Sequence, residues 1–308
     1  MVSDVLVILD GASEPVVDDE PTSLERADTP VLDALAQAGT VRRLRTTPDG
    51  LPPGSETGIA VLLGWMPDAP VDRAALEAAG LGLEIGAARE AWRVDAPDIE
   101  ALRFPPEVEV HPLGPHKLLA IVPAGYPLRS DGVWPRGITP PRTLDESTVV
   151  VGAPGAALGL ARLLGARVLT TDVPATAAVV EIAAGASRVV VHVDTPDEAA
   201  HRRDPDAKVA ALSRADDEVI GPIAAAVHTH GGTLTVTADH GTDPRTGTHD
   251  AAPVPAVTWD PEASAGEELP DDEDLPVLAT PKRRATTGAT TGRRMTERWV
   301  ATLPIEAP

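Results

Sequence analysis

Short aliphatic runs that alternate with helical segments are the feature that most constrains the fold of this chain. The run from Asp4 to Leu9 reads DVLVIL, and later runs read TVVV from Thr148 and RVVVHV up to Val193. Continuous apolar runs bounded by turn residues indicate strands that are buried on both faces of a parallel sheet. Because segments with helical periodicity lie between them, the sequence predicts an α/β fold with a mainly parallel sheet flanked by helices.

This alternation is interrupted in the middle of the chain. Proline and turn residues are dense there, helical periodicity shows only from Arg73 to Leu83, and one strand is indicated from Lys117 to Val122. We therefore expect a core formed by residues 1–66 and 148–308, with a small inserted α+β domain at residues 67–147.

Composition limits the partners and the location of the protein. The 308 residues include no cysteine, which excludes disulfides and thiolate metal sites, and the formal net charge is -21. Nucleic acids and anionic membranes require a positive surface, so we expect neither as a partner, whereas a small anionic substrate remains compatible. The amino terminus shows no basic leader, and no apolar run reaches about eighteen residues, so a soluble cytoplasmic protein is expected. Composition does not indicate the oligomeric state.

A strand near the carboxyl end leads into a cluster of potential metal ligands. The segment from Thr233 to His249 reads TLTVTADHGTDPRTGTH, so the strand ends on Asp239 and His240, and a short polar loop leads to His249. Neutral imidazole and carboxylate oxygens are ligands for divalent zinc or manganese. A loop with solvated histidines is the alternative interpretation.

Other polar residues stand where strands end or helices begin, and each has a structural alternative. Asp10 ends the first strand, where Asp-Gly can simply form a turn. Ser55 follows Pro-Pro-Gly at a helix amino terminus, where it could be an N-cap or a nucleophile favoured by positive potential. Asp197 and His201 are four residues apart, so they face one side of a helical turn as a metal-binding pair or a surface ion pair.

Together these residues could form a two-metal site for phosphoryl transfer. Two metal ions can clamp the attacking and leaving oxygens and activate a serine hydroxyl. The remaining histidines have no convincing partners in the sequence and are expected to be structural or surface residues: His111, His116, His192, His228 and His230.

The motifs occur in an order that resembles the cofactor-independent phosphoglycerate mutases, in particular the archaeal-type branch of that family within the alkaline phosphatase superfamily. The matching segments are ILDG at 8–11, TSLERADTPVLDALAQAG at 22–39, PGSETG at 53–58, DTPDEAAH at 194–201, and TADHGT at 237–242 with His249.

This resemblance implies an alkaline-phosphatase-like core and a lid domain inserted into it. It also implies that Ser55 accepts the phosphoryl group and that 3-phosphoglycerate and 2-phosphoglycerate are interconverted. Two divalent ions, manganese first with zinc or magnesium as alternatives, would be bound without an organic cofactor. One ion would be held by Asp10, Ser55, Asp239 and His240, and the other by Asp197, His201 and His249. The substrate candidates are Arg129, Arg136 and Arg202.

Three departures from the family pattern leave the substrate open. The insertion is short, Ala200 precedes His201 with Arg202 and Arg203 following, and Glu-Thr-Gly-Ile follows the nucleophile where archaeal-type members have Asp-Thr-Ala-His. A small lid could exclude water less completely. The alternatives are therefore a phosphatase, a mutase of another phosphorylated or phosphonate metabolite, and a metal-binding protein without catalytic activity.

Overall fold

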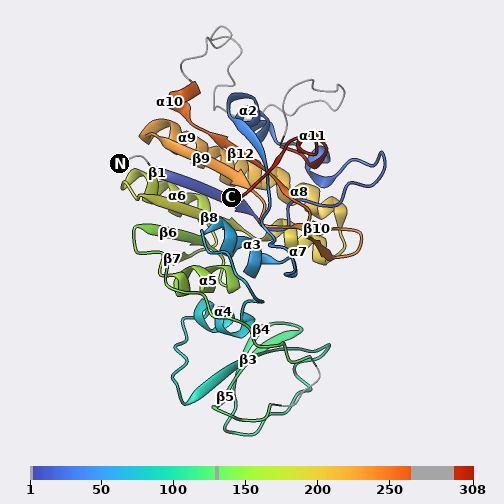
Figure 1. The fold of residues 1–308 in the computed structure, drawn as a ribbon, viewed down its shortest axis with the longest axis vertical. Coiled ribbons are helices and arrows are strands. Elements are labelled where there is room, and N and C mark those ends of the chain that lie inside the picture. Colours follow the sequence, from blue (N-terminus) through green and yellow to red (C-terminus); the bar gives the residue numbers. More distant parts are fainter. Residues whose placement is uncertain (1–2, 129–131, 265–294) are drawn as a thin grey trace.

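An eight-stranded mixed sheet forms the centre of the computed structural model, which describes residues 3–128, 132–264 and 295–308 (Figure 1). In spatial order the strands are β13 (Ile305–Glu306), β2 (Thr40–Leu44), β12 (Val254–Trp259), β9 (Gly232–Thr237), β1 (Ser3–Leu9), β8 (Arg188–Val193), β6 (Thr148–Gly152) and β7 (Arg167–Thr170). All neighbours are parallel except that β12 runs antiparallel to both β2 and β9. The predicted α/β fold with a mainly parallel sheet is confirmed.

Helices cover both faces of this sheet. Val7 and Ile8 of β1 point to opposite faces, and both are 0% exposed. The helices are α1 (Ser23–Arg26), α2 (Pro30–Ala38), α3 (Ser55–Leu62), α4 (Arg73–Gly80), α5 (Ala156–Leu164), α6 (Pro174–Ala183), α7 (Thr195–His201), α8 (Pro205–Ala215), the π-helix η1 (Asp216–Ile220), α9 (Gly221–His230), α10 (Pro261–Ser264) and α11 (Glu297–Val300).

A second, three-stranded antiparallel sheet lies beyond α4, at the opposite end of the molecule from α10 (Figure 1). It consists of β3 (Arg89–Asp95), β5 (Lys117–Pro123) and β4 (Glu109–Gly114), in that order. The strand expected at Lys117 is confirmed, whereas β3 and β4 were not predicted. The sequence of β3 lacks the apolar pattern of a buried strand because one of its buried residues is Arg93, which pairs with Glu77 of α4 at 2.8 Å.

The chain enters and leaves this region through adjacent segments. The backbone N–H of Asp72 donates to Ile138 at 2.9 Å, and that of Ile138 donates to Pro70 at 2.8 Å. Helix α4 itself packs closely on α5, because a Cβ on Gly159 would lie 1.9 Å from the carbonyl oxygen of Leu76. Residues 67–147 thus include a helix that contacts the large core, and their assignment as a separate inserted domain stays a prediction.

The end of the chain returns to the large sheet. The short helix α10 follows β12, and residues 265–294 lie outside those that the structure describes. Met295 and Val300 then pack into the main core. Within the described ranges, no helix combines the length and the apolar character that a membrane crossing requires.

Asp216, in η1, stabilises the start of a distant helix. Its carboxylate accepts hydrogen bonds from the backbone N–H groups of Val31 and Leu32 at 3.0 and 2.8 Å, at the amino terminus of α2. The N-cap residue of α2, Thr29, makes no side-chain cap. The free backbone N–H groups at the start of α2 are therefore bound by a carboxylate that lies 185 residues away in the sequence.

We expect Asp216→Ala to lower the free energy of unfolding by about 1–2 kcal/mol, the usual cost of losing a helix cap. Chemical denaturation of the variant and of Asp217→Ala, whose side chain is exposed next to it, measures this effect. Equal stabilities of the two variants would contradict the capping role.

Candidate metal centre

Three adjacent parallel strands, β9, β1 and β8, bring their carboxyl ends to one edge of the large sheet. Asp10 directly follows β1, Asp239 and His240 follow β9, and β8 leads into α7 with Asp197 and His201. Residues from distant parts of the sequence therefore meet where α/β proteins usually place their sites.

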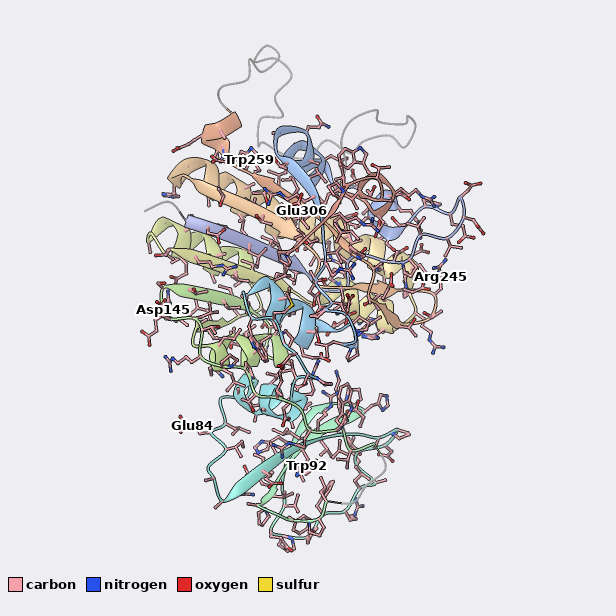
Figure 2. All side chains as sticks on the ribbon, viewed as in Figure 1. Glu84, Trp92, Asp145, Arg245, Trp259 and Glu306 are labelled. Carbon is pink, nitrogen blue, oxygen red and sulfur yellow. The ribbon has the colours of Figure 1, made fainter. Side chains whose placement is uncertain are left out.

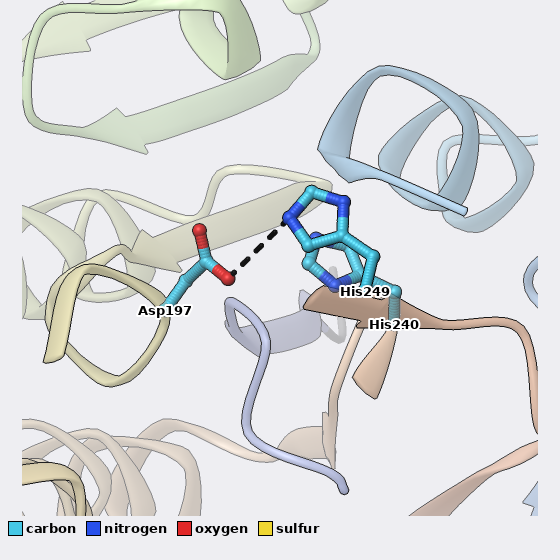
Figure 3. Close-up of side chains that lie close together, drawn as sticks. All are labelled: Asp197, His240 and His249. Carbon is cyan, nitrogen blue, oxygen red and sulfur yellow. Dashed lines mark ion pairs between the residues drawn. The ribbon is translucent and has the colours of Figure 1, made fainter. Parts of the chain in front are cut away.

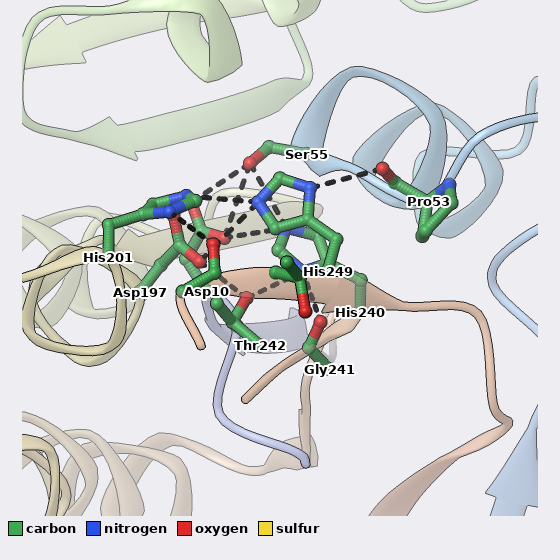
Figure 4. Close-up of polar contacts among 12 residues, drawn as sticks. Asp10, Pro53, Ser55, Asp197, His201, His240, Gly241, Thr242 and His249 are labelled. Atoms are coloured by element: carbon green, nitrogen blue, oxygen red, sulfur yellow. Dashed lines mark hydrogen bonds and ion pairs between the residues drawn. The ribbon is translucent and has the colours of Figure 1, made fainter. Parts of the chain in front are cut away.

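A first group of side chains surrounds Ser55, the first residue of α3 (Figure 4). The Ser55 hydroxyl lies 3.1 and 3.2 Å from the two carboxylate oxygens of Asp10 and 3.4 Å from Nε2 of His240. That Nε2 lies 3.2 Å from Oδ1 of Asp10 and 3.5 Å from Oδ2 of Asp239. Among the described residues, Oδ2 of Asp239 is buried without a hydrogen-bond partner, which suits an atom that binds a cation.

A second group adjoins the first and contains Asp197, His201 and His249 (Figures 3 and 4). His249 belongs to β11 (Thr248–Asp250), which forms a hairpin with β10 (Gly241–Asp243). Asp197 lies 3.1 Å from Nε2 of His201 and 3.8 Å from Nε2 of His249. The expected pairing of Asp197 and His201 on one side of a helix is thus present.

The ring nitrogens of the second group favour a bound cation. Nδ1 of His201 lies 3.0 Å from the carbonyl oxygen of Gly247, and Nδ1 of His249 lies 3.1 Å from that of Pro53. A carbonyl only accepts, so each Nδ1 carries the proton, and a neutral ring presents a lone pair on Nε2. The two Nε2 atoms are 3.0 Å apart. Nε2 of His201 also lies 3.1 Å from Asp197, whose hydrogen bond raises the pKa of His201, so either a proton on this nitrogen or a metal ion in its place can separate the two lone pairs.

Two sets of residues each offer three potential ligand atoms that lie within 4.8 Å of one another. The first set is Asp10, His192 and Asp239, and the second is Asp197, His240 and His249. His240 therefore lies between the groups, within reach of both. The expectation that His192 has no partner is wrong. His192 is buried, and its Nε2 lies 3.0 Å from Asp10. A histidine within the buried run RVVVHV needs a polar partner, and this pattern could have predicted the contact of His192 from the sequence.

Two glycines allow the backbone to approach these ligands closely. Gly11 has φ +58°, and a Cβ there would lie 2.4 Å from a carboxylate oxygen of Asp197. On α3, a Cβ at Gly58 would lie 2.2 Å from the backbone carbonyl oxygen of Asp239. The helix that carries Ser55 can therefore contact the Asp239 segment only because residue 58 has no side chain.

Protons compensate the negative charge of the metal-free site. Burial lowers the pKa of His240, but Asp239 and Asp10 outweigh this effect and raise it to about 10. Burial, followed by the charge of Asp10, raises the pKa of Asp239 to about 7. Burial opposes ionisation of Asp10, yet its bonds with His192 and His240 keep its pKa well below the ordinary value. The group thus retains protons at neutral pH where a metal ion could replace them.

The three arginines proposed to bind the substrate lie in different surroundings. Arg136 is hydrogen-bonded to Asp72 at 2.7 Å and lies over the ring of Trp92, in the small sheet seen in Figure 2. Arg202 is exposed and lies 3.6 Å from Glu198. Arg129 is outside the described residues. Their roles in substrate binding stay predictions.

Comparisons with known proteins relate this chain to a family of metalloenzymes. Residues 167–281 match the family model of the metalloenzyme superfamily, and residues 36–101 match that of 2,3-bisphosphoglycerate-independent phosphoglycerate mutase. A Geobacter sulfurreducens protein named "Probable 2,3-bisphosphoglycerate-independent phosphoglycerate mutase" is 26% identical over 84% of this chain and 91% of its own. Phosphoglycerate mutase 2 of this type from Methanothermobacter thermautotrophicus is 26% identical over 82% of this chain and 87% of its own.

Solved structures share the fold. The PH0037 protein from Pyrococcus horikoshii has a TM-score of 0.69 at 21% identity, covering 84% of this chain and 87% of its own. Cofactor-independent phosphoglycerate mutase from Thermoplasma acidophilum has a TM-score of 0.56 at 17% identity, covering 84% and 90%. Residues 167–281 therefore resemble the metalloenzyme superfamily, that of the alkaline phosphatases. The chain is a homologue of the archaeal-type 2,3-bisphosphoglycerate-independent phosphoglycerate mutases.

Gly58→Ala should push α3 away from Asp239 and lower the free energy of unfolding by about 1–3 kcal/mol, as overpacking does. Gly86→Ala is the matched control, because a Cβ there meets no atom within 4 Å. Denaturant titration of both variants checks this, and a Gly58→Ala variant as stable as Gly86→Ala would contradict the close contact.

The metal-free protein should lose stability as the pH rises from about 7 to about 10. The folded pKa of His240 is about 10, above the unfolded value of about 6.5. The folded state therefore binds an extra proton in this interval, and that contribution, complete below the unfolded pKa, disappears as the pH approaches 10. Melting temperatures of chelator-treated wild type and His240→Gln would measure it. A wild-type curve parallel to that of His240→Gln would contradict the assignment.

Proposed function

We propose that this protein transfers phosphoryl groups through Ser55 with the help of two divalent metal ions, and that it interconverts 3-phosphoglycerate and 2-phosphoglycerate. The convergence of the Ser55 hydroxyl with Asp10 and His240, beside imidazole nitrogens that face one another, is the observation that carries the proposal. The homologous mutases supply the substrate class.

The donor set fits two metal ions. Asp10, Ser55, Asp239 and His240 would hold one, and Asp197, His201 and His249 the other. His192 would either join the first set or orient Asp10. Bound there, the ions would neutralise phosphoryl charge and lower the pKa of the serine hydroxyl, with manganese, zinc and magnesium all compatible with oxygen and imidazole ligands.

The chain's own groups then have defined tasks. Asp10 would orient the Ser55 hydroxyl for attack, since its carboxylate accepts the serine hydrogen bond. Gly54, before Ser55, gives α3 no side-chain cap, so the first amide donors of this helix would be available to phosphate oxygens. The phosphoryl group would pass to Ser55 and then return to the other hydroxyl of the reoriented substrate.

Residues 67–147 would act as a lid that excludes water while Ser55 carries the phosphoryl group, because hydrolysis would end the mutase cycle. Partly buried ion pairs connect this region to the helix of Ser55: Arg73 pairs with Glu56 at 2.7 Å and with Glu77 at 3.0 Å, and Glu77 also pairs with Arg93. Arg129, Arg136 and Arg202 would be the candidates for binding the substrate carboxylate or phosphate.

Phosphatase activity on a small phosphorylated metabolite is the second candidate. The alignment with the Geobacter relative spans 363 residues, more than the 308 of this chain, so the relative contains segments that this chain lacks. A reduced lid would admit water and release phosphate. A metal-binding protein without catalysis is less consistent with a serine positioned between metal ligands.

We expect the wild-type protein with manganese to convert 3-phosphoglycerate into 2-phosphoglycerate, and Ser55→Ala to reduce the rate by about three orders of magnitude or more, as loss of a nucleophile does. Isomer and inorganic phosphate should be measured in the same reaction, with Ser147→Ala, an exposed serine, as the control.

The products separate the candidates. Phosphate without isomer would support the phosphatase. Neither product with manganese, zinc or magnesium, from a panel of small phosphorylated metabolites, would contradict phosphoryl transfer.

A further inference from the structure

Lys208 of α8 is a charged side chain that is 0% exposed. The chain contains lysine only at positions 117, 208 and 282, and the proposed chemistry uses none of them. A buried ammonium group is costly unless several acceptors compensate it. The groups that accept hydrogen bonds from Lys208 therefore indicate which segments its ammonium group connects.

The ammonium group joins the two segments that carry the first metal group. Nζ of Lys208 donates to the carbonyl oxygens of Ser13 at 3.0 Å and Thr242 at 2.7 Å. Ser13 lies three residues after Asp10, and Thr242 lies two residues after His240. The two segments also bond directly, since the backbone N–H of Thr242 donates to Ser13 at 2.8 Å.

Thr242 extends this connection to the second metal group. Its hydroxyl donates to Oδ1 of Asp197 at 2.6 Å and lies 3.2 Å from Nδ1 of His240. A shift of the Thr242 backbone would therefore move hydrogen bonds to one candidate ligand of each ion.

A largely buried carboxylate also pairs with the ammonium group. Oε2 of Glu14 lies 3.1 Å from Nζ, and Oε1 of Glu14 accepts the backbone N–H of Ser23 at 3.0 Å. The backbone N–H of Glu14 donates to Glu297 of α11 at 3.1 Å. Lys208 thus has acceptors from the segments after β1 and β9, held in turn by α1 and α11.

We infer that Lys208 is a positioning residue of the metal centre: its ammonium group sets the separation of the Asp10 and His240 segments and thereby the affinity for both ions. This inference rests on the proposed two-metal function. Within the described residues, the hydrogen bonds of the Lys208 ammonium group go to the backbones of Ser13 and Thr242, so its effect passes through them.

Lys208→Met tests the inference, because methionine keeps most of the length and loses every N–H. We expect manganese affinity, measured by calorimetry on chelated and reloaded protein, to fall about tenfold or more, as for other residues that orient metal ligands. In the metal-free variant, the amide of Thr242 should exchange hydrogen faster than in the wild type.

Leu212→Ala, on the same helix, is the control for general destabilisation. Leu212 is buried in the main core, so this variant should lose about 2–5 kcal/mol of stability and keep wild-type manganese affinity under conditions where it is folded. Glu14→Gln is a milder variant that retains Lys208 without its carboxylate partner, and a smaller loss of affinity is expected from it.

The outcomes are distinguishable. Wild-type affinity in both Lys208→Met and Glu14→Gln, while the wild type binds two ions, would overturn the positioning role alone. Equal losses in Leu212→Ala and Lys208→Met would also overturn it, because stability would then explain the effect. A wild type that binds no manganese, zinc or magnesium would overturn the proposed metal centre and this inference together.

Discussion

Carboxylates and imidazole lone pairs that face one another stay together only if cations lie between them, and this constraint governs the site. Asp10, Asp197 and Asp239 meet His201, His240 and His249 within a few ångströms, and Oδ2 of Asp239 accepts no hydrogen bond from the described residues. In the metal-free protein, protons retained by His240 and Asp239 compensate part of this charge. Divalent ions would do so more completely and would add the chemistry that the homologous family suggests.

The fold keeps these groups close by placing β9, β1 and β8 side by side, with β1 in the centre. Packing then sets the remaining distances: Gly58 lets α3 contact the Asp239 carbonyl, and Lys208 bonds to both segments that follow β1 and β9. Ion pairs from Glu56 through Arg73 continue from α3, the helix of Ser55, towards the small sheet. Residues outside the set of candidate ligands thus contact the segments that carry these ligands.

Much of the fold could be predicted from local patterns, because buried strands such as DVLVIL carry their own signature. Strand ends and helix starts indicated the candidate ligands, the resemblance to a known family divided them between two ions, and their proximity follows from strand order. The missed features depend on tertiary contacts: β3 is obscured by the buried pair of Arg93 and Glu77, and His192 finds its partner only across the β1–β8 ladder. Likewise, the sequence near α2 does not reveal that Asp216 caps it.

Anomalous X-ray scattering from crystals of the manganese-loaded protein tests the central claim most directly. The account predicts two manganese peaks, one contacting Asp10 and Asp239 beside Ser55, and one contacting Asp197, His201 and His249. A peak elsewhere with none at either group, or saturating manganese that leaves both groups without a peak while zinc and magnesium also fail to bind, would contradict it.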